Sequence, residues 1–229
     1  MSAPQVLGTP LLLLDYDGTL AEIVLDPEAA RPHPEVPALL GALRERFPVY
    51  LVTGRSVASL SRLLPVPGLA VVGVHGMEAG RLGEAATPLV AEGDLDALET
   101  VRAHLPGIPG LSVEDKGLAV ALHYRGVAAG GEDALKAWAE TVPEGLDRLW
   151  GKKVLELRPR GYSKGRAAAR LAAEHPQATP LFIGDDTTDE EAFAALPNGL
   201  TIKVGEGDTR ARARLPDVGA VVAYLKRYL

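Results

Sequence analysis

The fold of this chain is decided by the stretch Leu11–Thr19, with the sequence LLLLDYDGT. Four consecutive leucines that stop at an acid and a glycine predict a short strand buried on both faces of a sheet. Because alternate side chains of an extended chain share a face, Asp15 and Asp17 can point into one space while Tyr16 turns away. Open α/β sheets bind ligands at the carboxyl ends of their strands. An acidic turn without chemical function explains this stretch alone equally well, because Asp and Gly are common turn residues.

The composition restricts the classes of function. The 229 residues suffice for one large domain or two small ones, and 47% of them are hydrophobic. A formal net charge of -6 without a basic run argues against nucleic acid as a partner. The absence of cysteine excludes disulfides and Cys-ligated zinc. The apolar run near the N-terminus is too short to span a bilayer, so we expect a cytoplasmic protein without a membrane partner.

Short apolar strands alternate with helices over most of the chain. This order implies right-handed crossovers and predicts an α/β fold, a Rossmann-like parallel sheet with helices on both faces. The segment 23–37 holds four prolines, and we expect no regular structure there. Strands are predicted over 11–14, 48–52, 69–74, 180–184 and, as the last, 200–204; helices are predicted over 37–46, 56–64, 164–174, 190–196 and 218–228.

A different pattern interrupts this alternation. Between about residues 87 and 158 the order is α-β-β-α-β-β with tight turns, which predicts an antiparallel sheet with helices on one side. We therefore expect a core domain formed by 1–87 and 159–229, into which an α+β cap domain is inserted over 88–158.

Polar residues follow four of the predicted core strands, and in a parallel sheet these strand ends lie on one edge. Crowded carboxylates repel one another and take up protons unless a cation lies among them. Oxygen ligands favour Mg²⁺, which typically bridges carboxylates to a phosphate. The strand-end residues are Asp15, Asp17, Thr53, His75, Asp185, Asp186 and Asp189.

These residues supply the parts that phosphoryl transfer needs. Asp15 is placed to be a carboxylate nucleophile, and Asp17 to be the acid and base. Thr53 and the Gly54 amide suit phosphate oxygens. Lys164 opens a predicted helix, where the helix dipole disfavours a cation, and a bound anion at the same edge explains its place.

Four short motifs resemble, in order, those of the haloacid dehalogenase superfamily: 15–19, 52–55, 163–165 and 184–190. The insert corresponds to the mobile cap of that superfamily. Within it, the chain resembles the bacterial trehalose-6-phosphate phosphatases over nearly its whole length, through the stretches 73–78, 113–125 and 151–165.

The resemblance implies a role for each matching residue. Asp15 would be the nucleophile and Asp17 the acid and base. Mg²⁺ would be held by the Asp15 carboxylate, the Asp17 carbonyl and Asp185, with Asp186 or Asp189 in support. Thr53 and Lys164 would bind the phosphoryl group, for which the Gly54 amide is a further candidate. In the insert, Glu114, Lys116 and Glu156 would contact the sugar hydroxyls. Further candidates for substrate binding are His75, Gly76 and Arg125.

The activity that this resemblance implies is Mg²⁺-dependent hydrolysis of trehalose 6-phosphate through an aspartyl-phosphate. A carboxylate at Asp17, where ion pumps of the superfamily carry threonine, indicates hydrolase or phosphomutase chemistry. The alternatives are the same chemistry on sucrose 6-phosphate or mannosyl-3-phosphoglycerate, or a sugar-phosphate sensor without catalysis. A trehalose-phosphate synthase would be a functional partner. Without the resemblance, Glu114 and Lys116 are simply solvated charges beside a turn.

Overall fold

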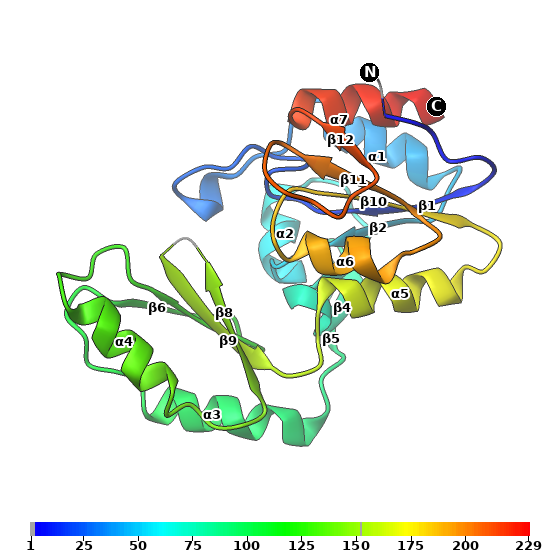
Figure 1. Cartoon of the computed structure of the whole chain (residues 1–229). Coiled ribbons are helices and arrows are strands. Elements are labelled where there is room, and N and C mark those ends of the chain that lie inside the picture. The colour runs from blue at the N-terminus through cyan, green and yellow to red at the C-terminus, as the bar shows by residue number, and fades with distance from the viewer. Residues whose placement is uncertain (1–2, 152) are drawn as a thin grey trace. The chain divides into compact units, whose positions relative to one another are not determined.

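The computed structural model describes residues 3–151 and 153–229 (Figure 1). The chain forms two compact units, one of Met1–Pro88 with Ser163–Leu229 and one of Leu89–Tyr162. The expectation that these parts act as a core and a cap remains a prediction. None of the helices in the described part of the chain is long and apolar enough to cross a membrane.

The first unit is built on an eight-stranded sheet with the order β12-β11-β10-β1-β2-β3-β4-β5. The strands from β12 to β3 are parallel, and β4 and β5 add an antiparallel edge. The predicted α/β class is therefore confirmed, although the sheet is mixed. The strands are β1 Pro10–Leu14, β2 Val49–Val52, β3 Ala70–Gly73, β4 Glu78–Arg81, β5 Thr87–Pro88, β10 Thr179–Gly184, β11 Leu200–Val204 and β12 Ala213–Leu215.

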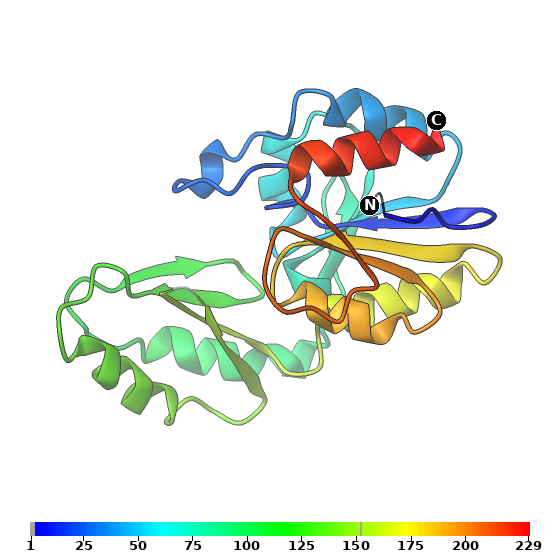
Figure 2. The ribbon, with the colours of Figure 1, turned by 45° about the horizontal axis from the view of Figure 1, so that its top comes forward.

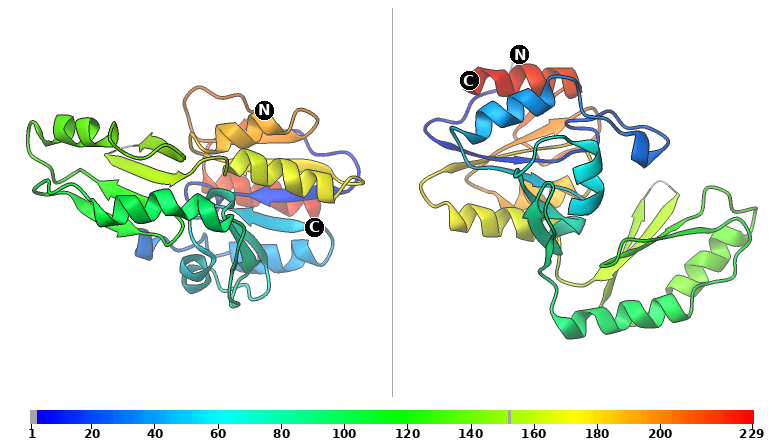
Figure 3. Two further views of the ribbon diagram at one scale, coloured as in Figure 1. Left: turned by 90° about the horizontal axis from the view of Figure 1, so that it is seen from below. Right: turned by 180° about the vertical axis from the view of Figure 1, so that it is seen from behind.

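Helices cover both faces of this sheet, as the views from two sides show (Figures 2 and 3). Leu12 and Leu14 pack against α1, α2 and α7, whereas Leu11 and Leu13 pack against α5 and α6. The four leucines are completely buried, because β1 is an inner strand with apolar layers on both sides. The helices are α1 Val36–Arg44, α2 Val57–Leu63, α5 Lys164–Glu174, α6 Asp189–Ala195 and α7 Val218–Leu225.

The second unit is an antiparallel sheet with the order β6-β7-β9-β8 and two helices on one face. Leu122 and Leu155, paired across β7 and β9, pack against Leu98 and Leu135 of the helices. This confirms the predicted α-β-β-α-β-β insert. Its elements are α3 Asp96–Ala103, β6 Ser112–Asp115, β7 Val120–His123, α4 Gly131–Ala139, β8 Leu146–Gly151 and β9 Val154–Pro159.

Two expectations about the first unit are wrong. The proline-rich segment contains a 3₁₀ turn, Pro27–Ala29, because Pro27 fits the first helical position and Asp26 accepts a hydrogen bond from the Glu28 amide. Residues 200–204 are not the last strand, because β12 pairs beyond them, and β4 and β5 were also unforeseen. These edge strands are short and polar, without the apolar alternation of a half-buried strand. Further 3₁₀ turns span Val74–Gly76, Glu92–Leu95 and Lys226–Tyr228.

Candidate functional site

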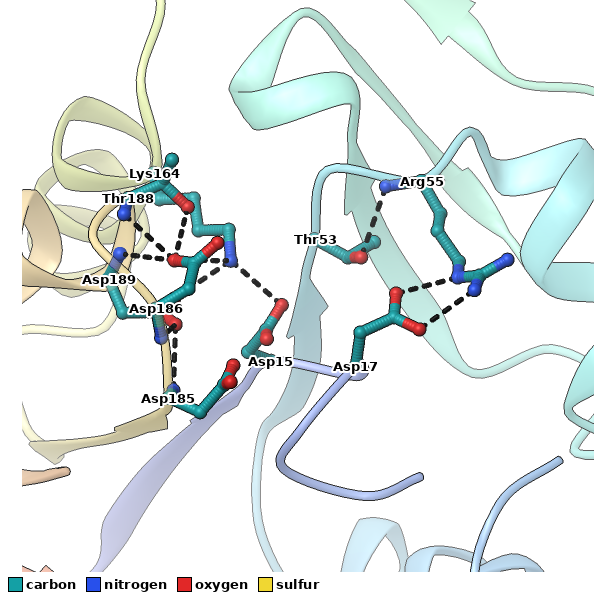
Figure 4. Close-up of polar contacts among 9 residues, drawn as sticks. All are labelled: Asp15, Asp17, Thr53, Arg55, Lys164, Asp185, Asp186, Thr188 and Asp189. Carbon is teal, nitrogen blue, oxygen red and sulfur yellow. Dashed lines mark hydrogen bonds and ion pairs between the residues drawn. The ribbon is translucent and has the colours of Figure 1, made fainter. Parts of the chain in front are cut away.

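The carboxyl ends of β1, β2 and β10 bring the strand-end residues together (Figure 4). β1 lies between β10 and β2 in the sheet, so the loop after β1 lies between the loops that follow β10 and β2. Asp15 comes from the end of β1, Thr53 from the end of β2 and Asp185 from the end of β10. The edge predicted from the sequence therefore exists as one cluster in the first unit.

Lys164 is the cation at the centre of this cluster. Its ammonium donates to Asp15 Oδ1 and to Asp189 Oδ1, both at 2.8 Å, and lies 3.8 Å from Asp186 Oδ1. The Lys164 side chain is 2% exposed, and the Asp189 side chain is fully buried. Ser163 caps the start of α5 by accepting a hydrogen bond from the Arg166 amide, and so fixes the turn from which Lys164 projects.

The loop after β10 is held in place by its own acids. Asp189 Oδ2 accepts hydrogen bonds from the Asp185 and Asp186 amides at 2.9 and 3.0 Å. Asp186 Oδ1 accepts from the Thr188 amide and hydroxyl and from the Asp189 amide. Asp186 therefore holds the amides at the start of α6, while Asp189 links this loop to Lys164.

The loops after β1 and β10 approach each other closely. Gly18 has φ +73°, and a Cβ on it would lie 2.1 Å from Asp185 Oδ2, so only glycine fits here. Asp15, Asp185 and Asp189 each offer a carboxylate oxygen within 4.8 Å of the others. This set of oxygen donors suits a hard divalent cation such as Mg²⁺.

Electrostatics also favours a cation at this place. Burial raises the pKa of Asp185 to about 7, with further contributions from Asp186 and Asp189. Burial likewise raises the pKa of Asp189 to about 6, although Lys164 lowers it. The pKa of Asp15 is also well above its ordinary value, mainly through burial. These three acids retain protons at a higher pH than free carboxyls do, and a divalent cation would displace those protons.

Asp17 has a different partner from Asp15. Its two carboxylate oxygens accept hydrogen bonds from Arg55 Nε and Nη2, both at 2.7 Å. Figure 4 shows the Asp17 and Asp15 carboxylates pointing in different directions. Burial lowers the pKa of Arg55, but the hydrogen bonds and charge of Asp17 more than compensate, and its pKa is raised. Tyr16, between the two acids, is buried and donates a hydrogen bond to the Ala30 carbonyl.

Thr53 and Gly54 form a turn after β2 that is packed against His75. Thr53 Oγ1 accepts a hydrogen bond from the Arg55 amide, so the Thr53 hydroxyl hydrogen can point elsewhere. The His75 amide donates to the Thr53 carbonyl, and a Cβ on Gly54 would lie 2.7 Å from His75 Nε2. His75 has φ +54°, which is uncommon outside glycine. Gly76 lies against the Ser163 carbonyl at the start of α5.

Three of the predicted substrate-binding residues of the second unit, Glu114, Lys116 and Glu156, take part in two side-chain contacts. Lys116 Nζ donates to Glu156 Oε2 at 2.7 Å, and His123 Nε2 lies 3.0 Å from Glu114 Oε2. Ala121 pairs with Glu114 on one side and with Glu156 on the other, so these two acids lie on one face of the sheet. Arg125 is exposed beyond β7, and in the described part of the chain it has no hydrogen bond to these residues.

Two charged residues of the first unit contact the site but were not anticipated as parts of it. Glu78 Oε1 accepts a hydrogen bond from the Val57 amide at 2.6 Å and so supports the start of α2, just after the Thr53 turn. Lys203, near the end of β11, donates a hydrogen bond to the Asp185 carbonyl. The available signal for Lys203 was a single charge near the end of an otherwise apolar strand.

Comparison with known proteins identifies the relatives of this chain. A family model described as trehalose-phosphatase matches residues 13–213. A trehalose-6-phosphate phosphatase-related protein of Thermoplasma acidophilum is 35% identical, over 90% of this chain and 91% of that protein. The trehalose-6-phosphate phosphatase of Escherichia coli K12 is 35% identical, over 97% of this chain and 88% of that protein. The chain spans only 56% of the trehalose-phosphate phosphatase of Mycobacterium marinum, to which it is 36% identical.

Solved structures agree with this relationship. The crystal structure of a trehalose-6-phosphate phosphatase related protein has a TM-score of 0.80 at 33% identity, with 94% of this chain and 95% of that chain covered. A haloalkanoate-superfamily phosphatase from Bacteroides thetaiotaomicron, at 16% identity and a TM-score of 0.69, shares the fold over 96% of this chain and 95% of its own. The chain belongs to the trehalose-phosphatase family, whose fold is that of the haloacid dehalogenase superfamily.

Proposed function

We propose that this phosphatase hydrolyses trehalose 6-phosphate to trehalose and phosphate in a Mg²⁺-dependent reaction through an aspartyl-phosphate at Asp15. The single observation that supports the proposal is that the two acids after β1 contact different cations. Asp15 contacts Lys164 in a buried cluster of oxygen donors, and Asp17 contacts Arg55. Asp15 would therefore attack a phosphate that Lys164 attracts, and Asp17 would handle the protons.

In the first step, an Asp15 carboxylate oxygen attacks phosphorus, and the bond from phosphorus to the sugar oxygen breaks. The leaving sugar oxygen takes a proton from Asp17, which must hold that proton when the step begins. In the Arg55 pair both Asp17 oxygens accept hydrogen bonds, as an ionised carboxylate does. Arg55 therefore stabilises the form of Asp17 that remains after the proton has been given away.

In the second step, the ionised Asp17 takes a proton from water, and the water oxygen attacks phosphorus. The bond between phosphorus and the Asp15 oxygen breaks, which releases phosphate and restores the Asp15 carboxylate. Asp17 holds a proton again and is ready for the next substrate. Lys164 and the Thr53 turn would contact the phosphoryl oxygens during both steps.

Asp15, Asp185 and Asp189 would hold the Mg²⁺ ion, with the Asp17 carbonyl as a further ligand. When bound, Mg²⁺ neutralises charge on the phosphoryl oxygens and on the clustered acids. Asp186 is not one of the three acids whose oxygens lie within 4.8 Å of one another, and its Oδ1 accepts from the Thr188 and Asp189 amides, so we assign it to support of this loop rather than to the ion.

The second unit would act as the cap that selects the sugar. The Lys116–Glu156 and Glu114–His123 pairs offer hydrogen-bond donors and acceptors close to one face of this sheet, which suits the hydroxyls of a disaccharide. We expect Glu156→Ala to raise KM for trehalose 6-phosphate about tenfold, the effect of losing one charged hydrogen bond. KM for p-nitrophenyl phosphate should hardly change. Glu132→Ala, which removes an exposed acid paired with Lys153, is the control. Equal KM changes for both substrates would make Glu156 structural.

Phosphate release from a panel of sugar phosphates tests the activity. The panel holds trehalose 6-phosphate, sucrose 6-phosphate, mannosyl-3-phosphoglycerate and p-nitrophenyl phosphate, each with Mg²⁺ and with EDTA. We expect the highest kcat/KM for trehalose 6-phosphate with Mg²⁺ and no turnover in EDTA. Faster turnover of another sugar phosphate would refute the substrate, and binding without turnover would indicate a sensor. A trehalose-phosphate synthase would be the enzyme that supplies this substrate.

A further inference from the structure

Lys203 is a buried cation of the first unit with no role in the steps above. It lies on β11, its residue is 7% exposed, and its ammonium donates a hydrogen bond to the Asp185 carbonyl. A buried ammonium is costly unless its charge is compensated and its hydrogen bonds are made. Its nearby opposite charge is the Asp185 carboxylate, whose pKa is raised by burial and lowered in part by Lys164 and Lys203.

The register of the sheet explains why Lys203 reaches this loop. Lys203 pairs with Gly184 of β10, so the two residues share a row and a face of the sheet. A Cβ on Gly184 would lie 2.2 Å from the Asp189 carboxyl carbon, so the missing side chain makes room for Asp189. On one side of that space, Asp189 holds the Asp185 and Asp186 amides. Lys203 donates a hydrogen bond to the Asp185 carbonyl. The peptide group before Asp185 is therefore held by Asp189, and the peptide group after it is held by both Asp189 and Lys203.

Lys203 also changes the charge of the cluster. The four acids Asp15, Asp185, Asp186 and Asp189 would repel one another strongly around Lys164 alone. With Lys203 added, four carboxylates and two ammonium groups leave two negative charges when all are ionised. One divalent cation would neutralise that charge, and Asp15, Asp185 and Asp189 form a group of oxygen donors that could hold one.

We propose that Lys203 is a positioning residue of the phosphatase site, which fixes the Asp185 peptide so that the Asp185 carboxylate meets those of Asp15 and Asp189 around a divalent cation. The inference rests on the proposed Mg²⁺-dependent reaction. It assigns Lys203 no contact with the substrate. Groups that orient a metal ligand typically contribute a factor of about 10 to 100 in metal affinity or activity.

The experiment compares Lys203→Met, Lys203→Arg and wild type in Mg²⁺ binding and in catalysis. Lys203→Met removes the donor and the charge, and Lys203→Arg keeps both. Mg²⁺ affinity is measured by calorimetry on substrate-free protein, and kcat and KM are measured at saturating Mg²⁺. Lys226→Met is the control, because Lys226 is exposed on the first unit and pairs with a single acid, Glu35.

We expect Lys203→Met to bind Mg²⁺ about tenfold more weakly and to lose kcat with little change in KM, because a misplaced ligand affects the reaction more than substrate binding. Lys203→Arg should recover most of both. If Lys203 acted through its charge alone, Lys203→Met would change Mg²⁺ affinity in the opposite direction, because removing a positive charge would strengthen Mg²⁺ binding. Unchanged or tighter Mg²⁺ binding by Lys203→Met would overturn the proposal.

Two further outcomes are separated by the same measurements. If circular dichroism shows that Lys203→Met does not fold, the same measurements are made on Lys203→Gln, because glutamine keeps an amide donor without the charge. A wild-type protein that binds no Mg²⁺ and releases no phosphate would refute the proposed function itself. An active, Mg²⁺-binding wild type with an equally active, equally tight-binding Lys203→Met would refute only the role of Lys203.

Discussion

Asp15 and Asp17 are separated by one residue in the chain and have opposite surroundings. The Asp15 side chain is 4% exposed and shares Lys164 with a second acid. The Asp17 side chain is 39% exposed and has both oxygens bound to one guanidinium. Asp15 is buried among other acids, and such a cluster favours the binding of a further cation. The charge of the more accessible Asp17 is balanced by its bidentate pair with Arg55.

The two surroundings suit two different proposed chemical roles at one strand end. The proposed nucleophile needs a dry place where Lys164 and a divalent cation gather the phosphate around Asp15. The proposed acid and base needs to exchange protons with the sugar oxygen and with water, so it has to be reachable. Gly18, which follows directly, lets the loop after β1 lie against Asp185 of the loop after β10.

The largest expected effect comes from Asp15→Asn. The amide oxygen of asparagine is a poor nucleophile, so phosphate release should fall by at least about 10⁴-fold. Lys164 keeps Asp189 as a partner, and substrate should therefore still bind in equilibrium dialysis. Asp26→Asn, in an exposed loop of the same unit, serves as the control. Residual activity within tenfold of wild type would show that Asp15 is not the nucleophile.

Asp17→Asn should have the second largest effect. Without an acid and base the rate should fall by a factor of about 10²–10⁴, the usual contribution of such a group. Because the second step also needs Asp17, phosphate should accumulate on the protein when an activated substrate such as p-nitrophenyl phosphate is used. The measurement is acid-stable phosphate on the protein that hydroxylamine releases. Normal turnover by Asp17→Asn would show that Asp17 is not the acid and base of the reaction.

Arg55→Lys tests the pair itself. Lysine cannot bind both oxygens of Asp17 as the planar guanidinium does, so the Asp17 carboxylate should lose its fixed direction. We expect kcat to fall about tenfold, with a smaller change in KM, since one bidentate pair is replaced by a single contact. Arg62→Lys, which alters the exposed pair with Glu28, is the matched control. If KM for the substrate rises instead while kcat holds, Arg55 acts as a phosphate ligand.

The sequence predicts most of this site for a physical reason. Asp15, Thr53 and Asp185 each follow an apolar strand, and parallel strands place their carboxyl ends on one edge whatever the loops do. The partners of the two acids could not be predicted in this way. Lys164 begins α5 and Arg55 follows β2, and only the three-dimensional path of the chain decides which acid each of these cations reaches.

Lys203 and the edge strands illustrate two further limits. A lysine near the end of an apolar strand reaches a neighbouring loop only if the register leaves space, and here that space depends on Gly184. The register of parallel strands is not visible in local periodicity. Strands β4 and β12 are held by backbone hydrogen bonds, which nearly any side chains allow, so their sequences carry little signal.

The smallest expected effect is on stability and links Mg²⁺ to pH. The pKa values of Asp185 and Asp189 are about 7 and about 6, above their ordinary value of 3.8. Between pH 4 and 7 the folded protein therefore binds protons that the unfolded chain releases, and the free energy of unfolding of metal-free protein falls as pH rises. Mg²⁺ has to displace these protons at pH 5 but not at pH 8, so it should raise Tm more at pH 8.

Thermal unfolding with Mg²⁺ and with EDTA, at half-unit steps from pH 5 to 8, measures this effect. Each kcal/mol of stabilisation should appear as about 2–4 °C in Tm for a chain of this size. Asp115 and Asp186 have lowered pKa values, so their contributions change below pH 4, outside this range. Asp185→Asn should flatten the pH dependence in EDTA and reduce the Mg²⁺ shift, while Asp17→Asn should leave both in place. A Mg²⁺ shift that is equal at pH 5 and pH 8 would mean that the buried acids carry no protons for Mg²⁺ to displace.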